Sequence, residues 1–306
     1  MNLSMRDAYG KKLADLGGTH SDLVVLDADV SASSKSSYFA KAFPDRFFNC
    51  GVAEANLAGV AAGLATAGFH PVINAFAIFI ALKSTDQIRH DFCYNNLPVI
   101  IAGAYGGLSD SFDGASHQSV ADIGILRSLP NMEVIVPGDN RQVEDALEYA
   151  AARKGPVYIR LSRNEVPELP AVPGFAAKTP LRLKEGTDLT IAATGLAAQW
   201  SLDAAELLEK EGIKAEVFSV PFVKPLDGTS LEASLRKTGR LVTVEEHSVV
   251  GGFGSACLET LAVSGVRFSY LPIGIQDTFG DTGPYAELLA AYGLSPKAIA
   301  EKIKTF

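Results

Sequence analysis

The chain has 306 residues, of which 47% are hydrophobic and 20% are charged, and its formal net charge at pH 7 is -8. This length predicts about two domains, and the acidic balance, without Lys/Arg clusters, argues against a nucleic-acid-binding surface. The N-terminus is polar, the apolar run 72–82 is too short for a bilayer, and Cys50, Cys93 and Cys257 lack metal-ligand spacing. We therefore expect a cytoplasmic protein without a signal peptide.

Hydrophobic spacing in the first half of the chain predicts repeated strand–helix units. Residues Met5–Leu16 have the spacing of an amphipathic helix. Apolar runs that end in polar residues predict buried parallel strands at 23–26, 47–50, 71–74, 99–102, 132–136 and 157–161. Helices are predicted from Glu54 onwards, over 75–94, from near 120 and over 142–152, and the Ser-rich stretch 31–37 is predicted to be a loop. These units predict a parallel sheet with helices on both faces.

Four prolines interrupt the pattern between Asn164 and Pro180, which indicates a linker. A second α/β unit follows, with predicted strands at 189–193, 215–220, 241–245 and 267–271 and predicted helices at 196–211, 230–238 and 254–264. The sequence therefore predicts two doubly wound α/β domains, residues 1–164 and 184–306, joined by a linker at 165–183.

Glu54 is the only formally charged residue between Arg46 and Lys83, and the segment around it is rich in Ala, Gly, Leu and Val. A carboxylate in such surroundings is costly to ionise. A solvated glutamate at a helix end, or one paired with a distant arginine, is the simpler interpretation. The long uncharged stretch around Glu54 instead favours a carboxyl group with a catalytic role.

Polar residues follow the predicted strand ends, where ligands gather in parallel sheets. Asp29 and Ser33 follow the first strand, although a solvated loop serine is the alternative for Ser33. His117 lies in a polar loop with Asp113 and is a candidate for binding or proton transfer. Arg163, after the last strand of the first domain, has the chemistry of a phosphate or carboxylate clamp, and an ion pair is an equal alternative.

Four motifs together resemble the transketolase family, and in particular the C-terminal subunit of transketolases that are split into two chains. They are GVAE at 51–54, DGASHQ at 113–118, LRSLPNM at 126–132 and LSR at 161–163. The resemblance covers nearly the whole chain. It implies a thiamine-diphosphate pyrimidine-binding domain, the proline-rich linker and a transketolase C-terminal domain.

The resemblance also implies roles for the candidate residues. In this family the glutamate at the position of Glu54 hydrogen-bonds N1′ of the cofactor's aminopyrimidine ring. The resemblance makes Glu54 and His117 the expected catalytic residues. Phe79 would stack on that ring, and Phe76 would line the same wall. His117 and Asp113 would contact the donor ketose. The remaining expected substrate-binding residues are Arg163 and Ser33, at the far end of the sugar, and Asp29.

The chain departs from the family pattern at two points, which bear on the expected partner subunit and on the expected donor. No Gly-Asp-Gly motif with a downstream Asn is present, although the family uses it to hold the diphosphate through Mg²⁺. The resemblance therefore implies that thiamine diphosphate is shared with an N-terminal subunit that binds the Mg²⁺, in an α2β2 heterotetramer. Tyr105 stands where bacterial transketolases usually have a phosphate-contacting histidine, which weakens the expectation of a sugar-phosphate donor.

Three alternatives remain open. The β chain of a 2-oxo-acid dehydrogenase has a similar plan but a different histidine loop. Deoxyxylulose-phosphate synthase shares the loop but normally contains the diphosphate-binding domain in the same chain. A non-catalytic regulatory subunit is disfavoured because Glu54, Phe79, Asp113, His117 and Arg163 are all present.

Overall fold

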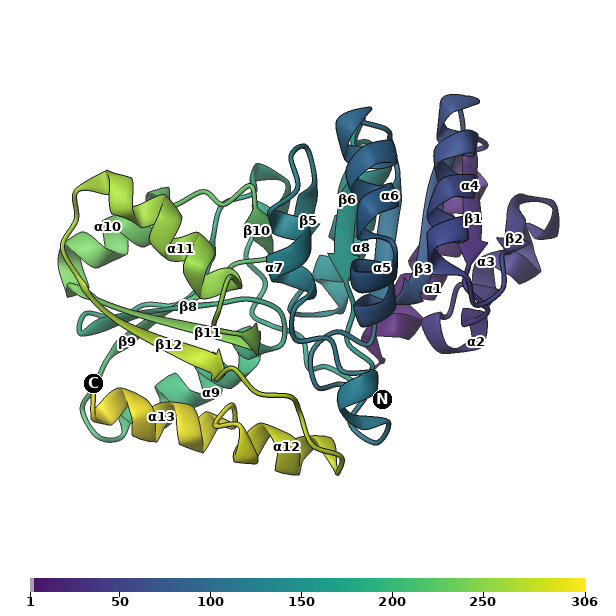
Figure 1. Cartoon of the computed structure of the whole chain (residues 1–306). Helices are drawn as coiled ribbons and strands as arrows, with labels where there is room; N and C mark the ends of the chain where they lie inside the picture. Colours follow the sequence, from purple (N-terminus) through teal and green to yellow (C-terminus); the bar gives the residue numbers. More distant parts are fainter. Residues whose placement is uncertain (1–2) are drawn as a thin grey trace.

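A computed structural model describes residues 3–306; residues 1 and 2, which begin the predicted first domain, lie outside the described residues. The chain forms two α/β domains, each built on a mainly parallel sheet (Figure 1). This confirms the predicted fold class.

The first domain has a seven-stranded sheet in the order β10-β5-β6-β4-β3-β1-β2. Its own strands are β1 (Leu23–Asp27), β2 (Phe47–Asn49), β3 (His70–Phe76), β4 (Ile100–Ala104), β5 (Glu133–Ile135) and β6 (Val157–Arg160). Its helices are α1 (Met5–Thr19), α2 (Ser31–Ser34), α3 (Ser37–Ala42), α4 (Glu54–Thr66), α5 (Ala77–Lys83), α6 (Thr85–Gln87), a π-helix (Ile88–Tyr94), α7 (Asp122–Arg127) and α8 (Asn140–Ala151).

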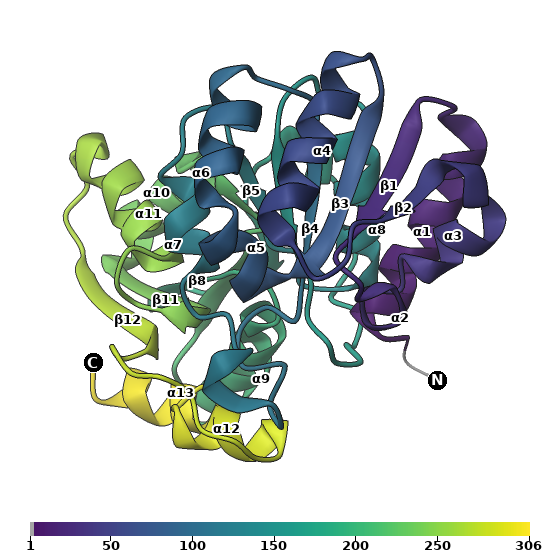
Figure 2. The same ribbon diagram turned by 45° about the vertical axis from the view of Figure 1, so that its right-hand side comes forward.

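Helices cover both faces of this sheet, which explains why its central strands are apolar along their length. Every residue of β1 and of β4 is buried. Side chains of α1 and α8 pack with Val25 and Ile159 on one face, and side chains of α4 pack with Val24 and Ile73 on the other. Figure 2 shows α4 and α5 side by side on the second face.

The second domain has a five-stranded sheet in the order β12-β11-β8-β9-β7, in which only β7 is antiparallel to its neighbour. Its strands are β7 (Leu181–Lys184), β8 (Leu189–Ala193), β9 (Ala215–Ser219), β11 (Arg240–Ser248) and β12 (Ser269–Ile275). Its helices are α9 (Ala197–Glu209), α10 (Thr229–Thr238), α11 (Phe253–Leu261), α12 (Tyr285–Ala291) and α13 (Pro296–Lys304). In Figure 1, α9, α12 and α13 lie on one face of this sheet and α10 and α11 on the other.

The two domains are joined by more than the linker. Strand β10 (Phe222–Lys224) belongs to the second half of the chain but pairs antiparallel with β5, at the edge of the first sheet. One hydrophobic cluster runs through both domains and includes Val134 from β5, Val223 from β10 and Phe253 from α11. The second domain is therefore packed directly against the first.

The structure corrects two predicted elements and adds others that were not predicted, among them β7, β10, α12 and α13. The stretch 31–37 contains helix α2 and the start of α3, because Ser34 and Ser36 donate hydrogen bonds to the buried Asp27 carboxylate and tie the turn to β1. The predicted helix 75–94 is not continuous: β3 extends to Phe76, and Ser84 separates α5 from α6. Helices α12 and α13 lie beyond the last predicted element.

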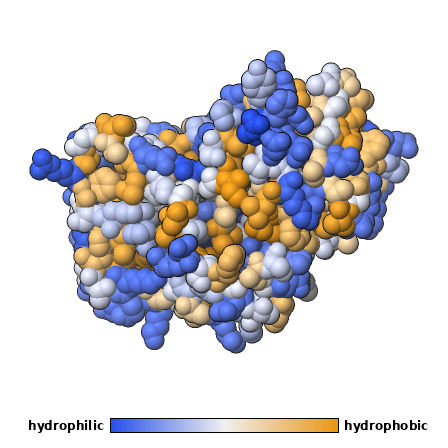
Figure 3. Space-filling model, viewed as in Figure 1, coloured by the Kyte–Doolittle hydropathy of each residue, from blue (hydrophilic) through white to orange (hydrophobic). Residues whose placement is uncertain are grey.

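Apolar side chains are exposed around α4 and α5. Val52 is 70% exposed, Leu82 59% and Val60 40%. Figure 3 shows hydrophobic patches over this part of the molecule. Exposed apolar patches often mark surfaces for protein partners. Among residues 3–306, no helix is long and apolar enough to cross a membrane.

Candidate functional site

Four aromatic rings meet where β3 and β4 end. Phe76 is the last residue of β3, Phe79 lies in α5, and Tyr105 follows β4 directly. The Phe76 ring centroid lies 4.5 Å from that of Tyr105 and 6.0 Å from that of Phe79. The fourth ring is His117, at 5.2 Å from Phe79. We refer to these residues as the aromatic cluster.

His117 reaches the cluster from the loop that follows β4. Its Nδ1 lies 2.9 Å from the Ser116 hydroxyl, and its ring stands edge-on to Phe79. Asp113, four residues earlier, is exposed at the start of the short 3-10 helix Gly114–Ser116. The loop therefore brings an imidazole to the aromatic cluster, with an exposed carboxylate four residues earlier in the same loop.

Glu54 is the first residue of α4, and its side chain is only 5% exposed. The carboxylate is paired with Lys83 at the end of α5, with Nζ 3.1 Å from Oε2 and 3.2 Å from Oε1. The same Nζ lies 4.5 Å from the centre of the Phe79 ring. Glu54 is therefore isolated from other charges along the sequence but not in space, because the next charged residue along the chain folds back onto it.

Two arginines, Arg6 and Arg163, lie against the Tyr105 ring, and we refer to them as the cationic group. The Arg163 guanidinium lies 5.4 Å from the Tyr105 ring centre and donates to the Asp110 carboxylate at 2.8 Å. Arg6, from α1, donates to the Tyr105 hydroxyl at 2.8 Å and to the Ser33 carbonyl at 2.6 Å. Sequence reasoning missed Arg6, because only the fold brings α1 next to the end of β4.

Asp110 is a buried carboxylate behind Arg163. Burial raises its pKa and nearby Asp113 raises it further, while Arg163 and His117 act in the opposite direction. Its Oδ2 has no hydrogen-bond partner among the described residues. The Arg163 side chain is still 41% exposed, so its pairing with Asp110 leaves part of the guanidinium accessible.

The predicted site residues do not all meet. Phe76, Phe79 and His117 are in contact, and Glu54 joins them through Lys83. Arg163 and Ser33 are linked to Tyr105, directly and through Arg6. Asp29 is exposed on the turn after β1, where it accepts a hydrogen bond from Asn49 at 2.8 Å. The structure connects Asp29 to Asn49 rather than to the aromatic cluster.

The second domain holds the loop that bears His117. Glu246, in β11, accepts a hydrogen bond from the Leu108 amide at 2.8 Å and another from the Tyr285 hydroxyl at 2.9 Å. Gln118 donates to the Asp281 carbonyl at 2.9 Å. Gly107 packs so closely on Glu246 that a Cβ there would overlap the carboxylate, and its φ of +68° also favours glycine.

A buried ion pair lies at the same junction. Arg160 contacts Asp122 through Nε at 2.8 Å and Nη2 at 3.2 Å, and Nη2 also donates to the carbonyls of Ser119 and Glu246. Burial acts to raise the pKa of Asp122, but the Arg160 guanidinium and further contacts outweigh it, so that pKa lies below its usual value. Burial also raises the pKa of Glu246 to about 7, against the opposing charge of Arg160. Arg160 is therefore structural, in contrast to the half-exposed Arg163.

The chain matches two domain families of known proteins. Residues 1–168 match the family described as the transketolase pyrimidine binding domain, and residues 179–299 match the transketolase C-terminal domain. The chain belongs to the transketolase family. It contains both domains in the order that the resemblance implied, with β7 beginning inside the 165–183 stretch.

Relatives of two lengths match this transketolase-family chain. It is 41% identical over 302 residues to a putative transketolase C-terminal section of Methanocaldococcus jannaschii, covering 98% of this chain and 95% of that protein. It is 38% identical to a 6-deoxy-6-sulfo-D-fructose transketolase subunit of a Clostridium species, covering 96% and 92%. It is 37% identical to a 1-deoxy-D-xylulose-5-phosphate synthase of Geobacter sulfurreducens, covering 97% of this chain but only 47% of that enzyme. The chain thus spans about half the length of its synthase relatives.

Solved structures agree in fold. A structure described as a split gene transketolase, inactive beta4 tetramer, aligns with a TM-score of 0.88 at 44% identity and covers 100% of this chain and 98% of its own. The transketolase of Campylobacter jejuni aligns with a TM-score of 0.86 at 22% identity, and this chain covers 47% of it. The second likeness concerns the fold alone.

The transketolase family depends on thiamine diphosphate, and the residues of this chain fit one part of that cofactor. A buried carboxyl next to an aromatic ring can hydrogen-bond and stack an aminopyrimidine, which is the arrangement of Glu54 and Phe79. The diphosphate end is different. Within residues 3–306, no group of three or more His, Cys, Asp or Glu side chains is placed to hold a metal ion.

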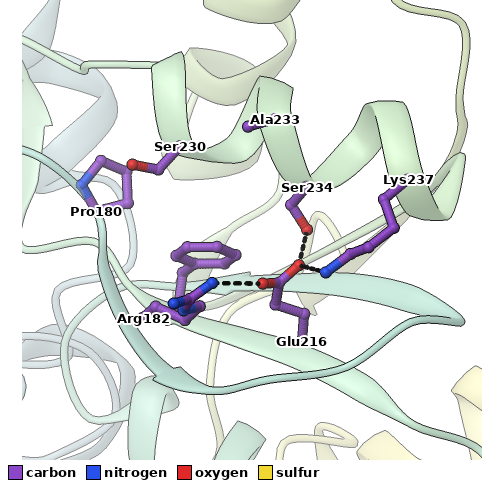
Figure 4. A pocket seen from close by; sticks show the side chains of 8 residues that line it. Pro180, Arg182, Glu216, Ser230, Ala233, Ser234 and Lys237 are labelled. Carbon is purple, nitrogen blue, oxygen red and sulfur yellow. Dashed lines mark hydrogen bonds and ion pairs between the residues drawn. The ribbon is translucent and has the colours of Figure 1, made fainter.

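A separate cavity lies in the transketolase C-terminal domain. It has a volume of about 410 Å³ and lies between α10 and the β7–β9 edge of the sheet (Figure 4). Glu216 at its base is bound by Lys237 at 2.7 Å and Ser234 at 2.5 Å, and Arg182 pairs with both Glu216 and Glu185. Two cations, Arg182 and Lys237, and one anion, Glu216, line this cavity, and none of its lining residues belongs to the aromatic cluster.

Proposed function

We propose that this chain is the C-terminal subunit of a two-chain, thiamine-diphosphate-dependent transketolase. It would transfer a two-carbon ketol unit from a ketose donor to an aldose acceptor. The observation that supports this most directly is the convergence of a buried carboxyl, an aromatic wall and an imidazole at Glu54, Phe79 and His117. Membership of the transketolase family gives that arrangement a specific chemistry.

Each group has a role that its surroundings support. Glu54 would hydrogen-bond N1′ of the aminopyrimidine, and Phe79 and Phe76 would hold the ring by stacking. When bound, thiamine diphosphate supplies the carbanion chemistry that the side chains of this protein cannot supply. His117 would bind the donor and move a proton at its hydroxyl or carbonyl oxygen, with Asp113 beside it.

The far end of the sugar would meet the cationic group around Tyr105. Arg163 and Arg6 both lie against that ring, and Ser33 is joined to it through Arg6. Two guanidinium groups suit an anionic tail, because arginine binds phosphate and similar groups through paired N–H donors. We therefore include Arg6 among the substrate-binding residues. Asp29 would act at most from the edge of the site.

The partner would be an N-terminal subunit that binds the diphosphate and Mg²⁺. Three observations support this: the described part of this chain has no metal cluster, α4 exposes apolar and glycine positions, and a 44% identical split transketolase is described as inactive when assembled as beta4. Gly59 and Gly63 of α4 have open space where a side chain would be, so another backbone can approach closely. We expect an α2β2 assembly in the cytoplasm, with the face around α4 covered by the partner.

A second candidate is a synthase-like activity that uses a 2-oxo-acid donor. It is favoured by the 37% identity to 1-deoxy-D-xylulose-5-phosphate synthase over 97% of this chain. A comparison of ketose and 2-oxo-acid donors on the assembled enzyme separates the two, because only one class should support turnover.

Calorimetric titration with thiamine diphosphate and Mg²⁺ tests the proposal. The chain is measured alone and mixed with a candidate N-terminal subunit, and Glu54→Gln provides the matched variant. We expect tight binding only in the mixture, and a nearly complete loss of turnover in Glu54→Gln with folding intact. Tight binding by the chain alone would contradict the shared site, and near-normal turnover of Glu54→Gln would remove Glu54 from the mechanism.

A further inference from the structure

Lys83 occupies the two contacts that the proposed function assigns to the aminopyrimidine ring. Its Nζ bridges both carboxylate oxygens of Glu54, at 3.1 and 3.2 Å, and lies 4.5 Å from the centre of the Phe79 ring. One ammonium group therefore binds the carboxyl and the aromatic face at the same time. A ring that accepted a hydrogen bond from Glu54 and stacked on Phe79 would require both of these surfaces.

The two contacts place opposite demands on the same oxygens of Glu54. The Lys83 ammonium contacts both oxygens and can only donate hydrogen bonds to them. A hydrogen bond to the N1′ nitrogen requires the carboxyl to donate a proton. The Lys83 contact and the proposed cofactor contact are therefore mutually exclusive at the same oxygens.

Lys83 is also able to leave. It is the last residue of α5, and Ser84 after it interrupts the helix before α6 begins at Thr85. Half of its side chain is exposed, at 50%, whereas Glu54 is at 5%. A long flexible lysine stem can turn its charged end into water at small cost, whereas the side chain of Glu54 is buried.

We propose that Lys83 is a placeholder for the aminopyrimidine as long as the cofactor is not bound. It satisfies the buried carboxylate of Glu54 and covers Phe79 until thiamine diphosphate binds to the two-chain assembly, and it then moves into solvent. This inference depends on the proposed function, because it assumes that Glu54 and Phe79 bind the ring. On this proposal, Lys83 lowers the affinity for thiamine diphosphate. It also provides the buried carboxyl of Glu54 with an ion-pair partner while the cofactor is absent.

The test compares cofactor affinity in the two-chain assembly containing wild-type chain, Lys83→Met or Arg89→Met. Methionine keeps much of the apolar stem and removes the charge. Arg89 is the matched control, because it is exposed and pairs with Asp86 rather than with Glu54. Inorganic diphosphate with Mg²⁺ is the second probe, since it lacks the ring and should bind only where the diphosphate binds.

We expect Lys83→Met to tighten thiamine diphosphate binding roughly five- to thirtyfold, the range that follows from losing one ion pair and one cation–π contact. Binding of inorganic diphosphate should be unchanged, and Arg89→Met should bind both ligands as the wild type does. Unchanged or weaker thiamine diphosphate binding by Lys83→Met would overturn the placeholder while leaving the proposed function intact. Failure of every assembly to bind thiamine diphosphate would overturn the proposed function and the placeholder with it.

Discussion

The ion pair between Arg160 and Asp122 should be among the most sensitive points of the fold. Both side chains are buried, with exposures of 6% and 0%, and the guanidinium contacts the carboxylate through two nitrogens. Arg160→Met would leave the Asp122 charge buried without its partner, which typically costs about 3–5 kcal/mol. Losing the hydrogen bonds to the carbonyls of Ser119 and Glu246 adds about 1 kcal/mol each.

Urea unfolding of the single variant and of the double variant Arg160→Met/Asp122→Asn measures this cost. The double variant should recover part of the free energy of unfolding, because it contains no unpaired charge. Arg89→Met serves as an exposed control and should cost less than about 1 kcal/mol. A cost for Arg160→Met no larger than that of Arg89→Met would refute the reasoning, as would a double variant less stable than the single one.

Two further predictions concern pH and substrate. The pKa of Glu246 is about 7 in the folded chain, against about 4.5 in the unfolded chain. The stability that Glu246 contributes is therefore complete below pH 4.5 and is lost as the pH rises through 7. Glu246→Gln removes this loss. Between pH 5 and pH 8 the free energy of unfolding of the variant should therefore gain about 2.5 kcal/mol on that of the wild type, at about 1.4 kcal/mol per pK unit; parallel pH profiles in thermal or urea unfolding would contradict this. If Arg163 binds an anionic tail, Arg163→Ala should raise KM for phosphorylated ketoses about tenfold or more, the scale of a charge-assisted hydrogen bond. Steady-state kinetics with phosphorylated and unphosphorylated ketoses checks this, and equal effects on both would exclude the role.

Much of the fold was predictable because its signals are local. Apolar runs such as those of β1 and β4 are buried on both faces, so they need no alternation and stand out as strands. The helix that begins at Glu54 and the break at the proline-rich segment were likewise visible in composition. The motifs around Glu54 and His117 were sufficient to predict the family and most of the aromatic cluster.

Other features depended on contacts between distant parts of the chain. Ser34 and Ser36 belong to helical turns rather than to a loop because the buried Asp27 carboxylate accepts hydrogen bonds from their hydroxyl groups, and no local sequence pattern indicates that contact. Strand β10 is only three residues long, and it exists as a strand because the edge of the first sheet offers it a partner.

The charged residues of the site show the same difference between local signals and contacts from distant parts of the chain. The local pattern indicates an acid in an apolar helix and a histidine loop after a strand. The cations near these residues come from distant parts of the chain: Lys83 contacts Glu54 across 29 residues, and Arg6 contacts Tyr105 across 99. Which charged residues pair depends on their distance in space. Hydrophobic periodicity indicates the helices and strands, but it does not specify which of their ends will lie close together.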